Sequence, residues 1–248
     1  MSIRKKILAT SIGPVLVLGV ITLLFMLTMV KSSLMDEVQD ALKGTAAATL
    51  AAYDQNTGDY LESTNGDIWK GSYNISKSES LVDRIKENTG MDVTFFYGNK
   101  RIMTSALDKK GNRILGSEAG ERVVKQVIKG KKPFFSTNVS LDGTRNYGYF
   151  IPVYQNGTTD QVIGMVFVGT NKAQKDAIVN KILGSIMMAL LVVMFLCIVT
   201  AMRMAASISK NIKNSVAVVG KLADGHSVLN VVMVEDVGQL DEVVVVAY

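Results

Sequence analysis

Two long uncharged apolar runs, at residues 7–30 and 182–202, dominate the pattern of hydrophobic and polar positions along this 248-residue chain. At 1.5 Å per residue, a helix of either run is long enough to cross the roughly 30 Å hydrocarbon core of a bilayer. The first run is longer than the apolar core of a cleavable signal peptide and is not followed by a small-residue cleavage site. We therefore predict two uncleaved transmembrane helices.

Basic residues beside the two runs predict their orientation. Arg4, Lys5 and Lys6 precede the first run, and Arg203 and Lys210 follow the second. Positive charge on short flanks favours the cytoplasmic side, whereas a long loop crosses the membrane largely regardless of its own charge. We expect a multi-pass protein of the cell (plasma) membrane with both termini in the cytoplasm. Its parts are a cytoplasmic tip at 1–6, a first span at 7–30, an extracellular domain at 31–181, a second span at 182–202 and a cytoplasmic segment at 203–248.

Between the spans, the period of the hydrophobic pattern changes twice. Helical spacing continues out of the first span over 33–52 and returns at 78–88 and 118–129. A period of two, bounded by turns rich in Gly, Asn and Asp, predicts five strands, at 93–97, 101–105, 133–139, 144–154 and 162–170. This order of helices and short strands predicts an α+β domain with an antiparallel sheet.

After the second span, apolar residues recur at alternating intervals of four and three, as in the seam of a parallel coiled coil. Gly225 is placed to end this helix in the left-handed conformation, and a second helical pattern follows Glu235 and Asp236. A seam of this kind can pass on a movement of the second span. The predicted signal-relay residues are Ile208, Ile212, Val219, Leu222 and Gly225.

Composition narrows the range of functions. A hydrophobic content of 48% excludes a simple cytosolic enzyme, and one cysteine cannot form a disulfide within the chain. With His226 as its single histidine, the chain has few residues from which a histidine-based catalytic site or a zinc site could be built. The net charge of +5 comes from basic residues spread along the chain, which does not favour a nucleic-acid interface. We expect a protein that is not an enzyme, with no metal, cofactor or nucleic-acid partner.

Five runs between the spans together resemble the single Cache domain, the PAS-like extracellular sensor of many methyl-accepting chemotaxis proteins. The runs are T-G-M-D-V-T-F-F-Y-G-N-K-R-I-M-T-S at 89–105, G-N-R-I-L-G-S at 111–117, V-I-K-G-K-K-P-F-F at 127–135, Y-F-I-P-V-Y at 149–154 and V-I-G-M-V-F-V-G at 162–169. The resemblance covers roughly residues 33–175. The segment after the second span resembles a HAMP domain, although Asn211 stands where that family commonly has proline.

The resemblance implies a ligand pocket between the sheet and the loops that cover it. In related sensors of citrate and C4-dicarboxylates, an arginine three residues before a histidine binds a carboxylate, and Arg101 and Thr104 occupy these two places. Those relatives have further basic residues on the strand before the proline that matches Pro152. This strand has none at the matching places, which argues against a di- or tricarboxylate. The predicted ligand-binding residues are Arg101, Thr104, Tyr147, Tyr149, Phe95 and Tyr97.

Other roles for these residues stay open at this point. Arg101 could equally be a surface arginine of a hairpin, and Phe95 and Tyr97 could belong to the core. Tyr147 and Tyr149, with Ile151, alternate onto one face of their strand and would give a partly aromatic pocket for a small or weakly charged ligand.

The resemblance implies the input half of a bacterial chemoreceptor. A homodimer would bind a small extracellular solute, such as a small organic acid, and would pass the signal through the second span to the HAMP-like segment. We expect a truncated receptor, which would contact the chemotaxis kinase and adaptor only through a cytoplasmic hairpin missing from this sequence. Two alternatives remain: the sensor portion of a histidine kinase or nucleotide cyclase, and a membrane anchor with an extracellular adhesive domain.

Overall fold

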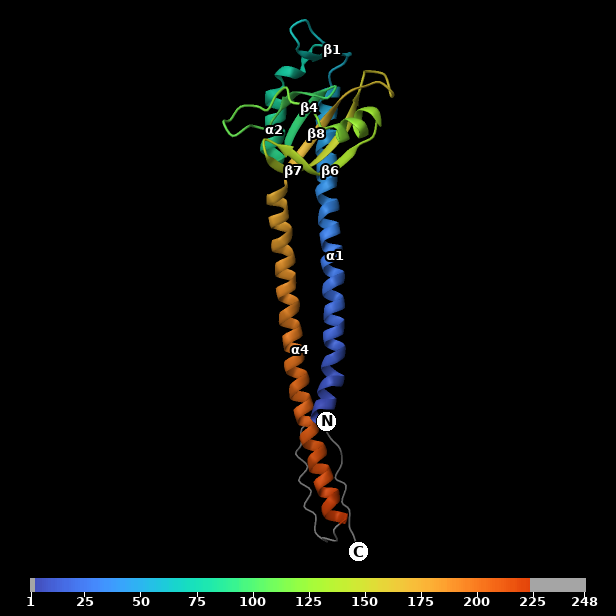
Figure 1. The fold of residues 1–248 in the computed structure, drawn as a ribbon, viewed down its shortest axis with the longest axis vertical. Coiled ribbons are helices and arrows are strands. Elements are labelled where there is room, and N and C mark those ends of the chain that lie inside the picture. The colour runs from blue at the N-terminus through green and yellow to red at the C-terminus, as the bar shows by residue number, and fades with distance from the viewer. Residues whose placement is uncertain (1–2, 224–248) are drawn as a thin grey trace. The chain divides into compact units, whose positions relative to one another are not determined.

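The computed structural model describes residues 3–223, which divide into two compact units. The sheet unit is Leu27–Ser185. The helical unit consists of the described residues up to Met26 and from Ile186 onward. Two long helices, α1 (Ile3–Asp54) and α4 (Lys172–Ala223), each contribute residues to both units (Figure 1).

The helical unit contains most of the two predicted spans. Both α1 and α4 are long and apolar enough to cross a membrane, and their most apolar windows are not buried within the structure. Large apolar side chains, among them Leu18 and Phe195, are exposed along both helices. Inside this unit Gly19 lies against Met194, so closely that a Cβ at position 19 would collide with the Met194 sulfur. A surface of this kind suits a lipid environment better than water.

The sheet unit is built on a five-stranded antiparallel sheet, which confirms the predicted α+β fold. The strand order is β5-β4-β8-β7-β6. Strands β4 and β5 therefore lie at one side of this sheet, and β8, β7 and β6 follow in the reverse of their order in the chain. All five strands lie within a few residues of their predicted places. They are β4 (Asp92–Tyr97), β5 (Lys100–Thr104), β6 (Phe134–Leu141), β7 (Thr144–Tyr154) and β8 (Val162–Asn171).

The two faces of this sheet carry separate hydrophobic clusters. On one face, Leu42 and Tyr53 of α1 pack with Phe95 of β4, and α2 (Glu79–Thr89) adds Val82. We call this the α1 face. On the other face, strand residues that include Phe167 pack under Val127 of a short helical segment. We call this the cavity face. The short segment consists of α3 (Glu121–Val123) and the π-helix η2 (Val124–Lys129).

Two parts of the sheet unit differ from the sequence prediction. The helix expected at 118–129 begins only at Glu121, because Glu118 forms a β-bridge with Lys100 instead. A small three-stranded sheet and a 3-10 helix between 60 and 77 were not predicted, since strands of two or three residues give no periodic signal. These elements are β1 (Tyr60–Glu62), β2 (Ile68–Lys70), β3 (Tyr73–Asn74) and η1 (Ile75–Lys77).

The HAMP-like prediction falls only partly within the described residues. The helix α4 continues without interruption to Ala223, so Ile208, Ile212, Val219 and Leu222 lie on the same helix as the second predicted span. Gly225 and the second helical pattern lie outside the described residues.

Candidate functional site

A β-bulge places the Arg101 side chain on the cavity face of the sheet. In the β4–β5 hairpin, Phe95 is opposite Met103, but Phe96 is opposite Arg101 because the register shifts between Phe95 and Phe96. Without the bulge, Arg101 would be opposite Tyr97, whose side chain belongs to the α1 face. The extra residue therefore turns the guanidinium toward the cavity face.

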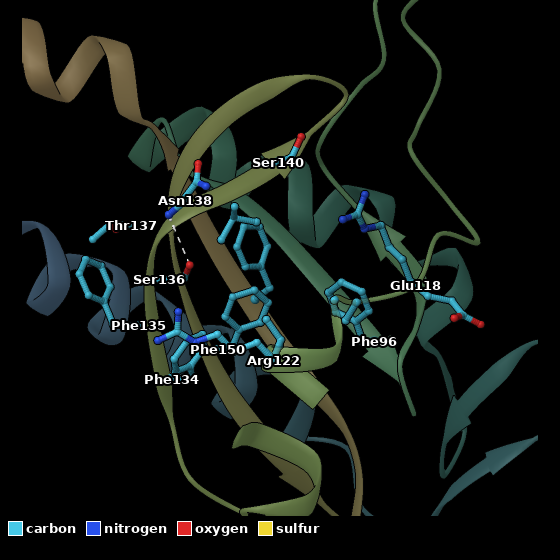
Figure 2. Close-up of a pocket in the computed structure, with 16 residues that line it drawn as sticks. Phe96, Glu118, Arg122, Phe134, Phe135, Ser136, Thr137, Asn138, Ser140 and Phe150 are labelled. Atoms are coloured by element: carbon cyan, nitrogen blue, oxygen red, sulfur yellow. Dashed lines mark hydrogen bonds between the residues drawn. The ribbon is translucent and has the colours of Figure 1, made fainter. Parts of the chain in front are cut away.

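A cavity of about 510 Å³ lies on this face. Its floor is Phe96, Phe150 and Phe167 from three strands, and one wall is the edge strand β6 from Phe134 to Ser140. Figure 2 shows the labelled side chains gathered around it. The opposite wall is the segment 118–123, which leads into α3. This volume is within the range of small-molecule sites, about 300–1,000 Å³.

The wall at 118–123 is held beside Arg101 by backbone hydrogen bonds. The Arg101 amide donates to the Ser117 carbonyl (2.9 Å), and the Ala119 amide donates to the Asn99 carbonyl (2.8 Å). This segment thereby pairs with the outer edge of β5, so no open strand edge remains there. The same pairing brings the Glu118 side chain to the cavity.

Arg101 is the buried charge of this cavity. Its side chain is only 8% exposed and lies over the Phe96 ring, with 5.4 Å from the guanidinium carbon to the ring centroid. Nη1 donates to the Ile114 carbonyl at 3.3 Å, whereas Nε is buried without a hydrogen-bond partner. No ion pair found among the described residues includes Arg101. Burial lowers the pKa of this guanidinium, and Asp92 opposes that effect in part.

An unpartnered buried donor is costly in the empty site. Leaving such a group unsatisfied costs about 1–3 kcal/mol, and more when the group is charged. A carboxylate that entered the cavity could accept hydrogen bonds from the guanidinium N–H groups that reach the cavity, although Nε itself has no accessible surface there. Arg101 is therefore suited to bind the anionic group of a ligand.

The cavity floor is a row of aromatic neighbours across adjacent strands. Phe150 of β7 is opposite Phe134 of β6 on one side and Phe167 of β8 on the other. The ring centroids of Phe150 and Phe167 are 4.8 Å apart. A Cβ at Gly148 would collide with the Phe167 ring and with Val139, so the absence of a side chain there leaves room for the ring.

The polar and charged side chains named next line the cavity nearer the surface than its aromatic floor does. Glu118, Arg122 and the β6 residues Thr137, Asn138 and Ser140 line the cavity and are exposed. The Arg122 guanidinium lies 5.3 Å from the centroid of the Phe134 ring. Among the described residues, no group of three or more His, Cys, Asp or Glu side chains could hold a metal ion.

Part of the chain matches a known protein family. Residues 73–182 match the family model described as single cache domain 3. This segment is a single Cache domain. The match spans α2, the whole five-stranded sheet and the start of α4, whereas the resemblance in the sequence had extended back to residue 33. None of the curated proteins matches the chain.

One similar solved structure is an "Extracellular ligand binding receptor from Desulfohalobium retbaense DSM5692". The similarity covers 62% of this chain and 26% of that chain, at 16% identity and a TM-score of 0.43. This chain thus spans about a quarter of the length of that receptor.

Within the Cache domain, Arg101 is the one predicted ligand-binding residue that lines the cavity. Thr104 also lies on the cavity face, opposite Thr94, but it is fully buried and already hydrogen-bonded. Its hydroxyl is 2.7 Å from the Thr94 hydroxyl and accepts a hydrogen bond from the Ala106 amide (3.1 Å). Thr104 therefore supports the β4–β5 hairpin in this structure.

The other four predicted residues lie on the α1 face of the Cache domain. Phe95, Tyr97, Tyr147 and Tyr149 belong to the cluster that packs against α1 and α2, and none of them lines the cavity. Tyr147 and Tyr149 do share a face, as predicted, but it is the face that α1 covers. Their binding role stays a prediction to which the cavity lends no support.

The Cache domain cavity uses residues that sequence reasoning passed over. Phe96 and Phe150 alternate with the predicted Phe95 and Tyr149, so choosing the other face of each strand would have found them. Arg122 gave no periodic signal that set it apart from other surface charges.

Proposed function

We propose that this chain is the input module of a bacterial transmembrane chemoreceptor, which senses a small extracellular organic acid. The observation that carries the proposal is the buried, unpaired guanidinium of Arg101 in the cavity of a Cache domain. A charge in that position has no ion-pair partner among the described residues and suits an anionic ligand. The proposal assigns no catalytic step to the chain.

The two apolar helices that flank the Cache domain support a membrane location. We propose that α1 and α4 cross the membrane with both chain ends in the cytoplasm, following the basic residues beside the apolar runs. A reporter enzyme that is active only outside the cytoplasm tests this topology. It should be active when fused after Gly111 and inactive when fused after Ala223, and the reverse result would contradict the proposed orientation.

Contacts between the cavity wall and α4 offer a route for the signal. Phe135 of β6 stacks on Tyr147, with ring centroids 6.4 Å apart, and the Tyr147 hydroxyl donates to Asp176 of α4 at 2.5 Å. Lys172, the first residue of α4, donates to the Thr137 carbonyl of β6 at 3.1 Å. A ligand that displaces β6 would therefore change the contacts that hold α4. Such a ligand shifts the receptor only if its affinity differs between the two states.

The signal would then reach a dimeric helical segment. Ile208 and Ile212 of α4 are exposed apolar residues at the spacing of a coiled-coil seam. We propose that the seam pairs with a second copy of the chain. Single cysteines introduced as Ile208→Cys and Ile212→Cys in a Cys197→Ala background should form disulfide-linked dimers in membranes. If neither variant cross-links, the dimeric relay is wrong.

A hybrid receptor tests the sensing role itself. Residues 1–202 joined to the cytoplasmic part of a chemoreceptor or histidine kinase should make its output respond to an added organic acid. Arg101→Gln should abolish the response, and Arg145→Gln, which removes a charge from an exposed place outside the cavity, should preserve it. A membrane anchor with an adhesive domain would respond to no solute, which would refute the proposal.

A further inference from the structure

The apolar lining of the Arg101 cavity constrains the body of the ligand. Phe134, Phe150 and Phe167 form a continuous aromatic row, and Phe96 lies directly under the guanidinium. Ser136 is the one half-buried polar side chain of the lining beside this row, so most hydroxyl or carboxyl groups of a ligand placed over the rings would lose water without gaining partners. An apolar or aromatic body would gain from burial and from ring contacts.

The charges of the lining constrain the ligand's own charge. Arg101, Arg122 and Glu118 are the charged lining residues, and together they carry a net charge of +1. Only Arg101 is buried, whereas Arg122 and Glu118 are exposed, where water weakens their interactions. A second ligand carboxylate would meet an exposed arginine and a repelling Glu118. One buried cation therefore matches one carboxylate.

We propose that the Cache domain cavity binds a monocarboxylate with an apolar, preferably aromatic, body, whose carboxylate pairs with Arg101 and whose body lies on the phenylalanine row. This inference rests on the proposed function and adds the chemical class of the ligand. It also gives the β6 residues a role, because the exposed Asn138 and Ser140 of the cavity wall can bond to a polar substituent of such an acid (Figure 2).

A panel of five compounds tests the class on the full chain in detergent or lipid nanodiscs. Phenylacetate is the probe, phenylacetamide removes its charge, acetate removes its body, succinate replaces the body with a second carboxylate, and L-phenylalanine adds one chain carbon that carries an ammonium group. Calorimetric titration should show phenylacetate binding at least about tenfold more tightly than phenylacetamide, acetate or succinate, because a charged hydrogen bond or a buried ring each contributes at least that factor. L-phenylalanine should also bind at least about tenfold more weakly, because its ammonium would lose water near the buried Arg101 guanidinium.

Two variants and one control variant locate the binding. Arg101→Gln should weaken phenylacetate binding by about ten- to a hundredfold, while Arg145→Gln should leave it unchanged. Phe134→Ser, at the half-buried end of the row, should weaken phenylacetate more than acetate. If Arg101→Gln does not fold, as shown by loss of its melting transition, the comparison of phenylacetate with phenylacetamide on the unaltered chain still measures the charge dependence.

The outcomes separate the two proposals. Tighter binding of succinate or L-phenylalanine than of phenylacetate, lost in Arg101→Gln, would overturn the monocarboxylate class and leave the acid-sensing site standing. Equal binding of phenylacetate and phenylacetamide would overturn the role of Arg101. Failure of every acid in the panel to bind would count against the acid-sensing site as well.

Discussion

The two faces of the five-stranded sheet are built from the same strands but are filled differently. On the α1 face, α1 and α2 pack on tyrosines and phenylalanines of the strands, and the tyrosine hydroxyls have partners such as Ser78, Asp54 and Asp176. On the cavity face, a space of about 510 Å³ remains, and the Nε of the buried Arg101 has no hydrogen-bond partner. The α1 face stabilises the domain, whereas the cavity face holds the Arg101 guanidinium, to which the anionic group of a ligand can bind.

The difference predicts that substitutions on the two faces change the stability of the domain to different extents. The largest loss of stability is expected on the α1 face. Phe95 is fully buried beside Tyr53 and Tyr60. Phe95→Ala should lower the free energy of unfolding by about 3–5 kcal/mol, because it leaves a hole that the rigid helix cannot fill. Phe134→Ala, at the half-buried cavity rim, is the matched control and should cost clearly less in thermal unfolding of the detergent-solubilised chain. Equal losses would mean that the cavity face is packed as tightly as the α1 face.

A smaller loss of stability is expected for a substitution at Gly148, where the cavity floor is closely packed. Gly148→Ala would drive a methyl group into the Phe167 ring and Val139, and should destabilise the domain by about 1–3 kcal/mol. Gly44→Ala on α1 meets no atom within 4 Å and should be neutral or slightly stabilising, since alanine favours a helix. The two melting temperatures provide the comparison. A neutral Gly148→Ala would show that the aromatic row can shift.

The unpaired arginine predicts a gain in stability. Arg101→Met removes a buried donor without a partner, and should raise the free energy of unfolding of the ligand-free chain by about 1 kcal/mol after loss of the contact with Phe96. The same variant should lose the response to ligand, as expected when a binding group is held at a cost in stability. Denaturant titration measures the gain. A clear loss of stability would indicate that Arg101 is a structural residue.

The smallest expected effect is a pH dependence of the α1 face. Burial, with hydrogen bonding to Asp176, raises the pKa of Tyr147 from 10.0 to about 12, and burial also raises the pKa values of Tyr53 and Tyr60. The folded state therefore keeps these protons when the unfolded chain has lost them, so stability is fully present below pH 10 and falls as the pH rises toward 12. Tyr147→Phe should make this fall shallower in melting curves between pH 9 and pH 12. An unchanged slope would exclude Tyr147 as a contributor.

Much of the fold could be predicted because its elements carry strong periodic signals. The two apolar runs, the helix 78–88 and all five long strands follow directly from spacing and turn residues. The short strands β1 to β3 could not be predicted, since they are held by contacts such as the paired hydrogen bonds between Tyr60 and Gln155, far apart in the sequence. The late start of α3 likewise depends on the bridge between Lys100 and Glu118.

The site was harder to predict, for a geometric reason. Alternation shows which strand residues share a face, but it does not show which face a helix covers. Arg101 was found through its place in a resembling motif, whereas the bulge that turns it onto the cavity face depends on the pairing of β4 with β5. The tyrosines were assigned to a pocket because they alternate, and α1 covers that side.

Cysteine protection tests most directly whether the cavity face is the ligand-binding face. In a Cys197→Ala background, Asn138→Cys places a thiol at the exposed wall of the cavity, and Glu62→Cys places one on β1, outside it. The rate of maleimide labelling would be measured with and without saturating phenylacetate. We predict that phenylacetate slows labelling at position 138 and leaves position 62 unchanged. Slower labelling at position 62 alone, or an unchanged rate at both positions while phenylacetate binds, would contradict the assignment of the ligand to this cavity.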